Sequence, residues 1–168
     1  MFFIGIVTDL QSKDNIYNLV KLNKFLKENN VIFVNEANID NIKNVHFDTI
    51  VINTGFGKID ELNVLLSNTK NLIVNIDVKI NLKELNVSNL NLITYGFNSK
   101  SSVTISSVTD DEVLICIQRN LSCKSRVVEV QEIKVENNNY NVYDIIVVLV
   151  LFLMYSSSLN EIHIKGAK

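Results

Sequence analysis

The chain has 168 residues and a formal net charge of −2, and this length is enough for one domain with its own hydrophobic core. Its lysine and arginine residues are dispersed, with no basic stripe interleaved with aromatic residues, so the sequence argues against a nucleic-acid partner. Its two cysteines, Cys116 and Cys123, lack the spacing of a metal-binding box, and two isolated thiols without a signal peptide suit the reducing cytoplasm. We therefore expect a cytoplasmic protein with no cysteine metal site.

The first hundred residues alternate between short apolar runs and amphipathic stretches. Their periodicity predicts helices at about residues 15–27 and 59–66 and strands at residues 2–7, 31–34, 49–53, 72–76 and 92–95. Continuous apolar strands separated by helices are typical of a parallel sheet that is covered on both faces. The predicted fold class is therefore α/β, with three layers and a mostly parallel sheet flanked by helices.

Beyond Gly96 the pattern changes to short strands joined by turns. The runs "SVTISSV", "EVLICIQ" and "RVVEVQEIKV" predict a small antiparallel β meander over about residues 101–136. This meander is expected to be appended to the parallel α/β part, at about residues 1–98. We expect the whole chain, residues 1–168, to form a single domain.

The segment "VYDIIVVLVLFLMYSSS" has a composition that resembles a membrane span. Its uninterrupted apolar run, residues 145–154, has 10 residues, which is about half of the ~20 that a bilayer core requires. Asp144 closes this run on one side and a serine cluster closes it on the other. A helix that is apolar all round is typical of the centre of a layered domain. We therefore predict a buried helix over about residues 141–156, and no membrane partner.

Several stretches follow one another in the order found in one enzyme family. "FDTIVINTG" has the form of a D-x-x-V-x-T-N strand, "NLIVNIDV" that of a V-x-N-x-D-D segment, and "LNLITYGFNS" that of a strand ending in T-Y/F-G. The meander follows, and then "YNVYDIIVVLVLFLMY" is similar to a helix that opens H-N-x-x-N-A-x-A-A. From Phe47 onward, over roughly two-thirds of the chain, this order resembles the ATP-binding central domain of the Mur ligases and of their poly-γ-glutamate and folylpolyglutamate synthase relatives.

The chain departs from this family at the phosphate-binding loop. Mur ligases carry a T-G-T-x-G-K-T/S loop whose backbone amides and lysine hold the nucleotide phosphates. The first loop of this chain, residues 8–14, contains no glycine, and the charges of Asp9 and Asp14 would repel a phosphate. The nearest string, "TGFGKI" at residues 54–59, is one residue short and has isoleucine in place of the hydroxyl that would reach Mg²⁺. The first loop is therefore not predicted to hold a phosphate.

The helix opening departs from the family as well. Tyr140 stands in place of the family's histidine and Asp144 in place of its second asparagine, so that only Asn141 is kept. The family's metal-binding acid and histidine, and its carbamylated lysine, have no counterparts in this sequence, and its C-terminal ligase domain is not present. The resemblance therefore implies a catalytically silent relative, a pseudoenzyme with no catalytic residues and no metal ligands.

Polar residues follow several of the predicted strands, and ligands of open α/β sheets bind outside the carboxyl ends of the parallel strands. Two interpretations stay open for them: a pocket for a small polar ligand or a cation, or ordinary loop chemistry in which Asn and Asp cap helices and accept turn hydrogen bonds. The candidate ligand-facing residues are Asp9, Thr54, Gly55, Gly57, Lys58, Asn75, Asp77 and Asn141.

These observations predict a non-catalytic Mur-ligase-like domain that acts through protein–protein contacts or by self-association, as a dimer, in cell-wall or amino-acid-ligase metabolism. A domain without its usual neighbours exposes surfaces that they would cover. The alternative is a nucleotide-binding protein, or a split-ligase subunit, that keeps ATP binding through residues 54–58. ATP and Mg²⁺ are expected as cofactors only under this alternative.

Overall fold

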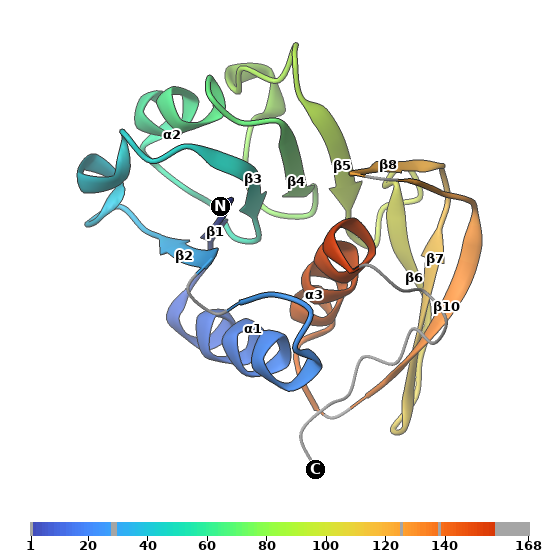
Figure 1. Cartoon of the computed structure of the whole chain (residues 1–168). Helices are drawn as coiled ribbons and strands as arrows, with labels where there is room; N and C mark the ends of the chain where they lie inside the picture. Colours follow the sequence, from blue (N-terminus) through green and yellow to red (C-terminus); the bar gives the residue numbers. More distant parts are fainter. Residues whose placement is uncertain (1, 28–29, 125, 138, 157–168) are drawn as a thin grey trace.

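The protein is built around one mixed β-sheet, seen in a computed structural model that describes residues 2–27, 30–124, 126–137 and 139–156 (Figure 1). The sheet has eight strands in the order β10-β7-β6-β5-β4-β3-β1-β2. Strands β1 to β5 run parallel, and β6 joins β5 in parallel through a single residue pair. Strand β7 runs antiparallel to both of its neighbours, β6 and β10. The strands are β1 (Phe3–Val7), β2 (Val31–Val34), β3 (Phe47–Ile52), β4 (Asn71–Asn75), β5 (Asn91–Tyr95), β6 (Val103–Val108), β7 (Glu112–Ile117) and β10 (Gln131–Glu136).

Helices cover both faces of the sheet, and this confirms the predicted three-layer α/β fold. Helices α1 (Leu10–Asn23) and α3 (Val142–Tyr155) pack on one face, against strand residues that include Ile6, Val51 and Ile73. The alternate residues of the same strands face a second core, formed with helix α2 (Ile59–Leu66) and the 3₁₀ turns η2 (Ile39–Ile42) and η3 (Leu82–Glu84). A strand side chain alternates between the faces, so runs that are apolar at every position are what two covered faces require.

The predicted antiparallel meander extends the main sheet. Strands β6, β7 and β10 continue the parallel part beyond β5, while β8 (Leu121–Cys123) and β9 (Arg126–Val128) form a separate two-stranded ribbon. The inward residues of the meander, among them Ile115 and Ile133, join the core that contains α3.

The predicted buried helix is confirmed. Figure 1 shows α3 between α1 on one side and strands β6, β7 and β10 on the other. Residues 144–154 are all buried, so the continuous apolar run has protein on every side of the helix. In the part of the chain that the structure describes, no helix is long and apolar enough to cross a membrane.

Helix α1 begins earlier than the sequence pattern predicts. It was expected at about residues 15–27, but it starts at Leu10, because the carboxylate of Asp9 accepts a hydrogen bond from the Ser12 backbone N–H at 2.8 Å and caps the first turn. It ends at Asn23, and Lys24 then adopts a left-handed conformation with a φ of 52°. The one apolar residue of the first turn, Leu10, is exposed, so the periodicity of buried apolar residues could not reveal this turn.

Candidate functional site

The order of the strands places a crevice at the carboxyl ends of β1 and β3. Strand β1 lies between β2 and β3, so the chain leaves β1 toward one side of the sheet and returns to the other side for β3. Helix α1 follows β1 on one face and α2 follows β3 on the opposite face. Open α/β sheets bind their ligands at such a reversal, because the two connections diverge there and leave a space between them.

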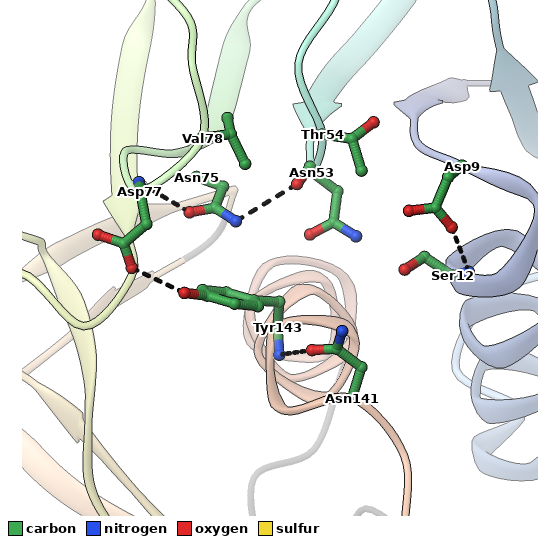
Figure 2. A pocket seen from close by; sticks show the side chains of 9 residues that line it. All are labelled: Asp9, Ser12, Asn53, Thr54, Asn75, Asp77, Val78, Asn141 and Tyr143. Atoms are coloured by element: carbon green, nitrogen blue, oxygen red, sulfur yellow. Dashed lines mark hydrogen bonds between the residues drawn. The ribbon is translucent and has the colours of Figure 1, made fainter.

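A cavity of about 230 Å³ lies at this point (Figure 2). In the view of Figure 2, Asp9 and Asp77 stand on opposite sides of the cavity and the Tyr143 ring lies below it. Among the described residues that line it, none is a lysine, an arginine or a histidine. The lining residues are Asp9, Ser12, Asn53, Thr54, Asn75, Asp77, Val78, Asn141 and Tyr143.

Asp9 is held in place by the helix that it caps. One of its carboxylate oxygens accepts the Ser12 N–H at the N-terminus of α1, where a nucleotide-binding domain would present free amides to a phosphate. A negative charge of the chain itself therefore takes the position that a phosphate would occupy. Because the cap comes from a side chain of the loop itself, the fold of this loop requires no glycine.

Asp77 is positioned by three separate features. Its Oδ2 accepts hydrogen bonds from the Phe97 backbone N–H at 2.6 Å and from the Tyr143 hydroxyl at 3.0 Å. Gly96 leaves room for the carboxylate, since a Cβ on this residue would lie 2.5 Å from Oδ2. Burial and the neighbouring carboxylate of Asp77 raise the pKa of Tyr143 to about 12, so the phenol is a neutral hydrogen-bond donor at physiological pH.

A layer of buried polar side chains lies directly behind the cavity and centres on Asn53. The Asn53 side-chain amide donates to Asp144 Oδ1 at 3.0 Å and to Thr8 Oγ1 at 3.2 Å, and its Oδ1 accepts the Tyr95 hydroxyl at 2.5 Å. Its backbone carbonyl accepts a hydrogen bond from the side chain of Asn75. Hydrogen bonds to both the side-chain nitrogen and the side-chain oxygen therefore determine the orientation of the Asn53 amide.

Asp144 is a fully buried carboxylate on the otherwise apolar helix α3. Its Oδ2 accepts a hydrogen bond from the Asn15 side chain at 2.9 Å, in addition to the bond from Asn53. Burial raises the pKa of Asp144, hydrogen bonds from Asn15, Ser12 and Asn53 act in the opposite direction, and the charge of Asp9 raises it again. The carboxyl group is thus surrounded by amide and hydroxyl donors, and none of these partners is a cation.

Five of the eight candidate residues line this cavity: Asp9, Thr54, Asn75, Asp77 and Asn141. Asn141 caps helix α3 by accepting the Tyr143 N–H at 3.0 Å. Sequence reasoning missed Ser12, Asn53, Val78 and Tyr143 as lining residues. Asn53 is the last residue of the strand predicted at residues 49–53, and this position at a strand end could have indicated that it lines the cavity.

The other three candidates, Gly55, Gly57 and Lys58, do not line the cavity. The Gly57 N–H donates to Glu36 Oε1 at 3.0 Å, and Lys58 Nζ pairs with Asp40 Oδ2 at 2.8 Å. Hydrogen bonds from Lys43 and Lys58 lower the pKa of Asp40 to about 2, so this carboxyl is ionised at neutral pH. The two donors that would bind a phosphate in this loop are therefore already paired with carboxylates.

The described residues were compared with the side-chain clusters that hold metal ions in proteins. Within the described ranges, no three His, Cys, Asp or Glu side chains gather closely enough to hold a metal ion. Cys116 and Cys123 are free thiols, and His46 is exposed. His163 and the rest of the chain after residue 156 lie outside the described residues.

Comparison with protein-family models and with curated proteins found no match to this chain. The resemblance to the Mur ligases therefore stays a prediction that rests on the motifs quoted above.

Proposed function

We propose that this chain is a non-catalytic binding domain whose site is the cavity at the carboxyl ends of β1, β3 and β4, and that its ligand is a small molecule with a positive charge. The observation that carries this proposal is the position of the Asp9 carboxylate on the N-terminus of α1. The charge that attracts a ligand in this cavity is negative, in contrast to the charge of a phosphate-binding loop.

The charges around the cavity support a cation over an anion. Asp9 and Asp77 are part of its wall, and the buried Asp144 receives hydrogen bonds from the lining residue Asn53. Two like charges ~4 Å apart repel by roughly 4 kcal/mol at an effective dielectric constant of about 20. A phosphate in this cavity would meet such repulsion, whereas an ammonium group would be attracted by the same carboxylates.

The size of the cavity supports an organic cation over a bare metal ion. The cavity of about 230 Å³ is many times larger than the ~10–15 Å³ that one water molecule requires. A metal ion needs several oxygen ligands that converge at ~2.0–2.6 Å. Asp9 and Asp77 instead stand on opposite sides of the cavity in Figure 2, with room between them for a group of several atoms.

Titration of the protein with methylammonium chloride, followed by amide chemical shifts, tests the proposal. We expect saturable shifts at residues of the cavity, and a loss of affinity of about tenfold or more in Asp9→Asn, because asparagine still caps a helix but carries no charge. Asp14→Asn is the matched control, since Asp14 is an exposed residue of the same helix that does not line the cavity. Equal binding by Asp9→Asn, or micromolar binding of ATP in place of the amine, would overturn the proposal.

The protein-contact function predicted from the sequence is a second candidate, and exposed apolar side chains support it. Val127 and Val130, in and after the β8–β9 ribbon, are 59% and 60% exposed, and Phe97 is 55% exposed. Sedimentation at micromolar concentration tests it: a dimer that dissociates on Val127→Ser supports self-association, and a monomer at every concentration contradicts it.

The nucleotide-binding alternative makes a different prediction. It requires Gly57 and Lys58 to exchange Glu36 and Asp40 for a phosphate. Stabilisation by ATP that depends on Mg²⁺ and disappears in Lys58→Ala would support this alternative, and co-purification with a separate ligase-domain protein would support a split ligase.

A further inference from the structure

A second and larger cavity, of about 690 Å³, lies beside the first one, at the carboxyl ends of β1 and β2. The first turn of α1 contributes to both cavities, and Asp9 belongs to both linings. We call the cavity of about 230 Å³ the inner cavity and the larger one the outer cavity. The outer lining includes Asp9, Leu10, Lys13, Phe33, Asn35 and Asn38.

We infer that the ligand is an amine with an apolar body, whose ammonium group lies in the inner cavity and whose body extends past Asp9 into the outer cavity. This inference rests on the proposed function, because it requires a cation between Asp9 and Asp77. It adds the chemical class of the ligand and assigns the outer cavity to the same molecule.

The volumes of the two cavities support a ligand that spans both. Ligand pockets of proteins usually measure ~300–1,000 Å³. The inner cavity, at about 230 Å³, is below this range, and the outer cavity, at about 690 Å³, is within it. A ligand that filled only the inner cavity would be very small, whereas one that shared Asp9 with both could be of ordinary size.

The exposed side chain of Leu10 also supports an apolar group in the outer cavity. Its side chain is 79% exposed, the largest exposed fraction among the large apolar side chains of the described residues, although it stands in the first turn of α1 beside the outer cavity. An aliphatic side chain in water gains free energy when another apolar group covers it. The apolar part of a ligand in the outer cavity would supply this cover next to the carboxylate that binds the ammonium group.

Two polar side chains of the outer cavity, Asn35 and Asn38, require little from a ligand. Asn38 Oδ1 accepts the Asn35 N–H at 2.9 Å, and the Asn38 amide donates to the Phe33 carbonyl at 2.8 Å. Asn35 Oδ1 in turn accepts the N–H groups of Ala37 and Asn38. Because these groups are already hydrogen-bonded, an apolar body that excludes water from them leaves few polar atoms unsatisfied.

Lys13 defines which amine fits. Its ammonium lies 5.8 Å from the centre of the Phe33 ring, and among the described residues it forms no ion pair. A second ammonium group on the ligand would meet this charge in the outer cavity. The site therefore favours a monoamine over a diamine of the same length.

Amide chemical-shift titration of the full chain with methylammonium, hexylammonium and 1,6-hexanediammonium tests the inference. We expect hexylammonium to bind at least tenfold more tightly than methylammonium, and the diamine to bind more weakly than hexylammonium. Leu10→Ser should weaken hexylammonium about fivefold and leave methylammonium unchanged, because roughly half of the burial energy of one leucine is lost. Leu22→Ser is the matched control, since Leu22 is a 40% exposed leucine of the same helix outside both linings.

The possible failures of the proposed function and of this inference can be told apart. If no amine binds, both are overturned. If methylammonium binds with the affinity of hexylammonium, or if Leu10→Ser and Leu22→Ser behave alike toward both amines, the inference is overturned and the proposed function stands. Saturable binding of phenylacetate that is lost in Lys13→Gln would show instead that the outer cavity takes the anion of a separate ligand.

Discussion

Replacement of Asn53 by alanine should destabilise the protein strongly, and by an amount that depends on pH. The substitution removes a donor from the buried carboxylate of Asp144 and the acceptor of the buried Tyr95 hydroxyl. A lost hydrogen bond to a charged group costs about 1.5–3 kcal/mol, and a buried hydroxyl left unsatisfied costs about 1–3 kcal/mol. We expect Asn53→Ala to lower the free energy of unfolding by about 3–5 kcal/mol at pH 7.5, a large part of the stability of a typical domain.

The sign of the pH dependence follows from Asp144. Burial already raises the pKa of this carboxyl in the folded protein, and loss of the Asn53 donor should raise it further. A group whose pKa is raised by folding contributes stability that is present below its unfolded pKa and is lost as the pH rises through the folded pKa. The deficit of Asn53→Ala relative to the unmodified protein should therefore be smaller at pH 4 than at pH 7.5.

Urea denaturation at the two pH values measures both effects, and Tyr95→Phe is the control. This variant removes the hydroxyl that donates to Asn53 but leaves both amide donors of Asp144 in place, so its deficit should be about 1–2 kcal/mol at either pH. A deficit of Asn53→Ala below about 1 kcal/mol at pH 7.5 would refute the proposed role of the buried layer. So would a deficit that does not change between the two pH values.

Three further substitutions test other parts of the structure. Gly96→Ala should displace the Asp77 carboxylate and strain a residue with a φ of 148°, so we expect a loss of about 1–3 kcal/mol in thermal denaturation and weaker methylammonium binding by chemical-shift titration. Lys58→Ala should leave both methylammonium binding and the midpoint of urea denaturation unchanged, because its partner Asp40 is an exposed side chain away from the cavity. Tyr155→Phe removes a hydroxyl that is hydrogen-bonded to two residues at the start of β3, and should cost about 1–2 kcal/mol in urea denaturation.

The layers of the fold could be predicted because most of the elements are marked by apolar residues. The helix expected at residues 59–66 has the bounds of α2, Ile59–Leu66, and the strand expected at residues 31–34 has those of β2, Val31–Val34. The start of α1 could not be predicted in this way, since its first turn is determined by one hydrogen bond from Asp9 and not by a buried face. That β6, β7 and β10 extend the main sheet also escaped prediction, because sequence pattern does not show which strand edges pair.

The site residues that could be predicted are those close in sequence to the carboxyl end of a parallel strand. Asn75 ends a parallel strand, and Asp9 and Thr54 each lie two residues after one, so the sheet itself brings them to one edge. Tyr143 belongs to α3, at the far end of the sequence, and reaches the cavity only through the packing of that helix beside α1. Its contact with Asp77 joins residues 66 positions apart, and no local pattern could indicate it.

The proposed cation ligand requires that carboxyl groups offset the dipoles of the two helices that point at the cavity. The N-termini of α1 and α3 both contribute residues to the inner cavity, and each carries a partial charge of about +0.5, which in other α/β domains attracts phosphate. Here each helix has its own carboxylate in the cap or first turn: Asp9 on α1 and Asp144 on α3. The charge of Asp9 is larger than the partial charge of the α1 N-terminus that it caps, and Asp77 adds another carboxylate from across the cavity. The loop without glycine after β1 and the aspartate in an apolar helix therefore have one feature in common: each places a carboxyl group of the chain itself at a helix N-terminus.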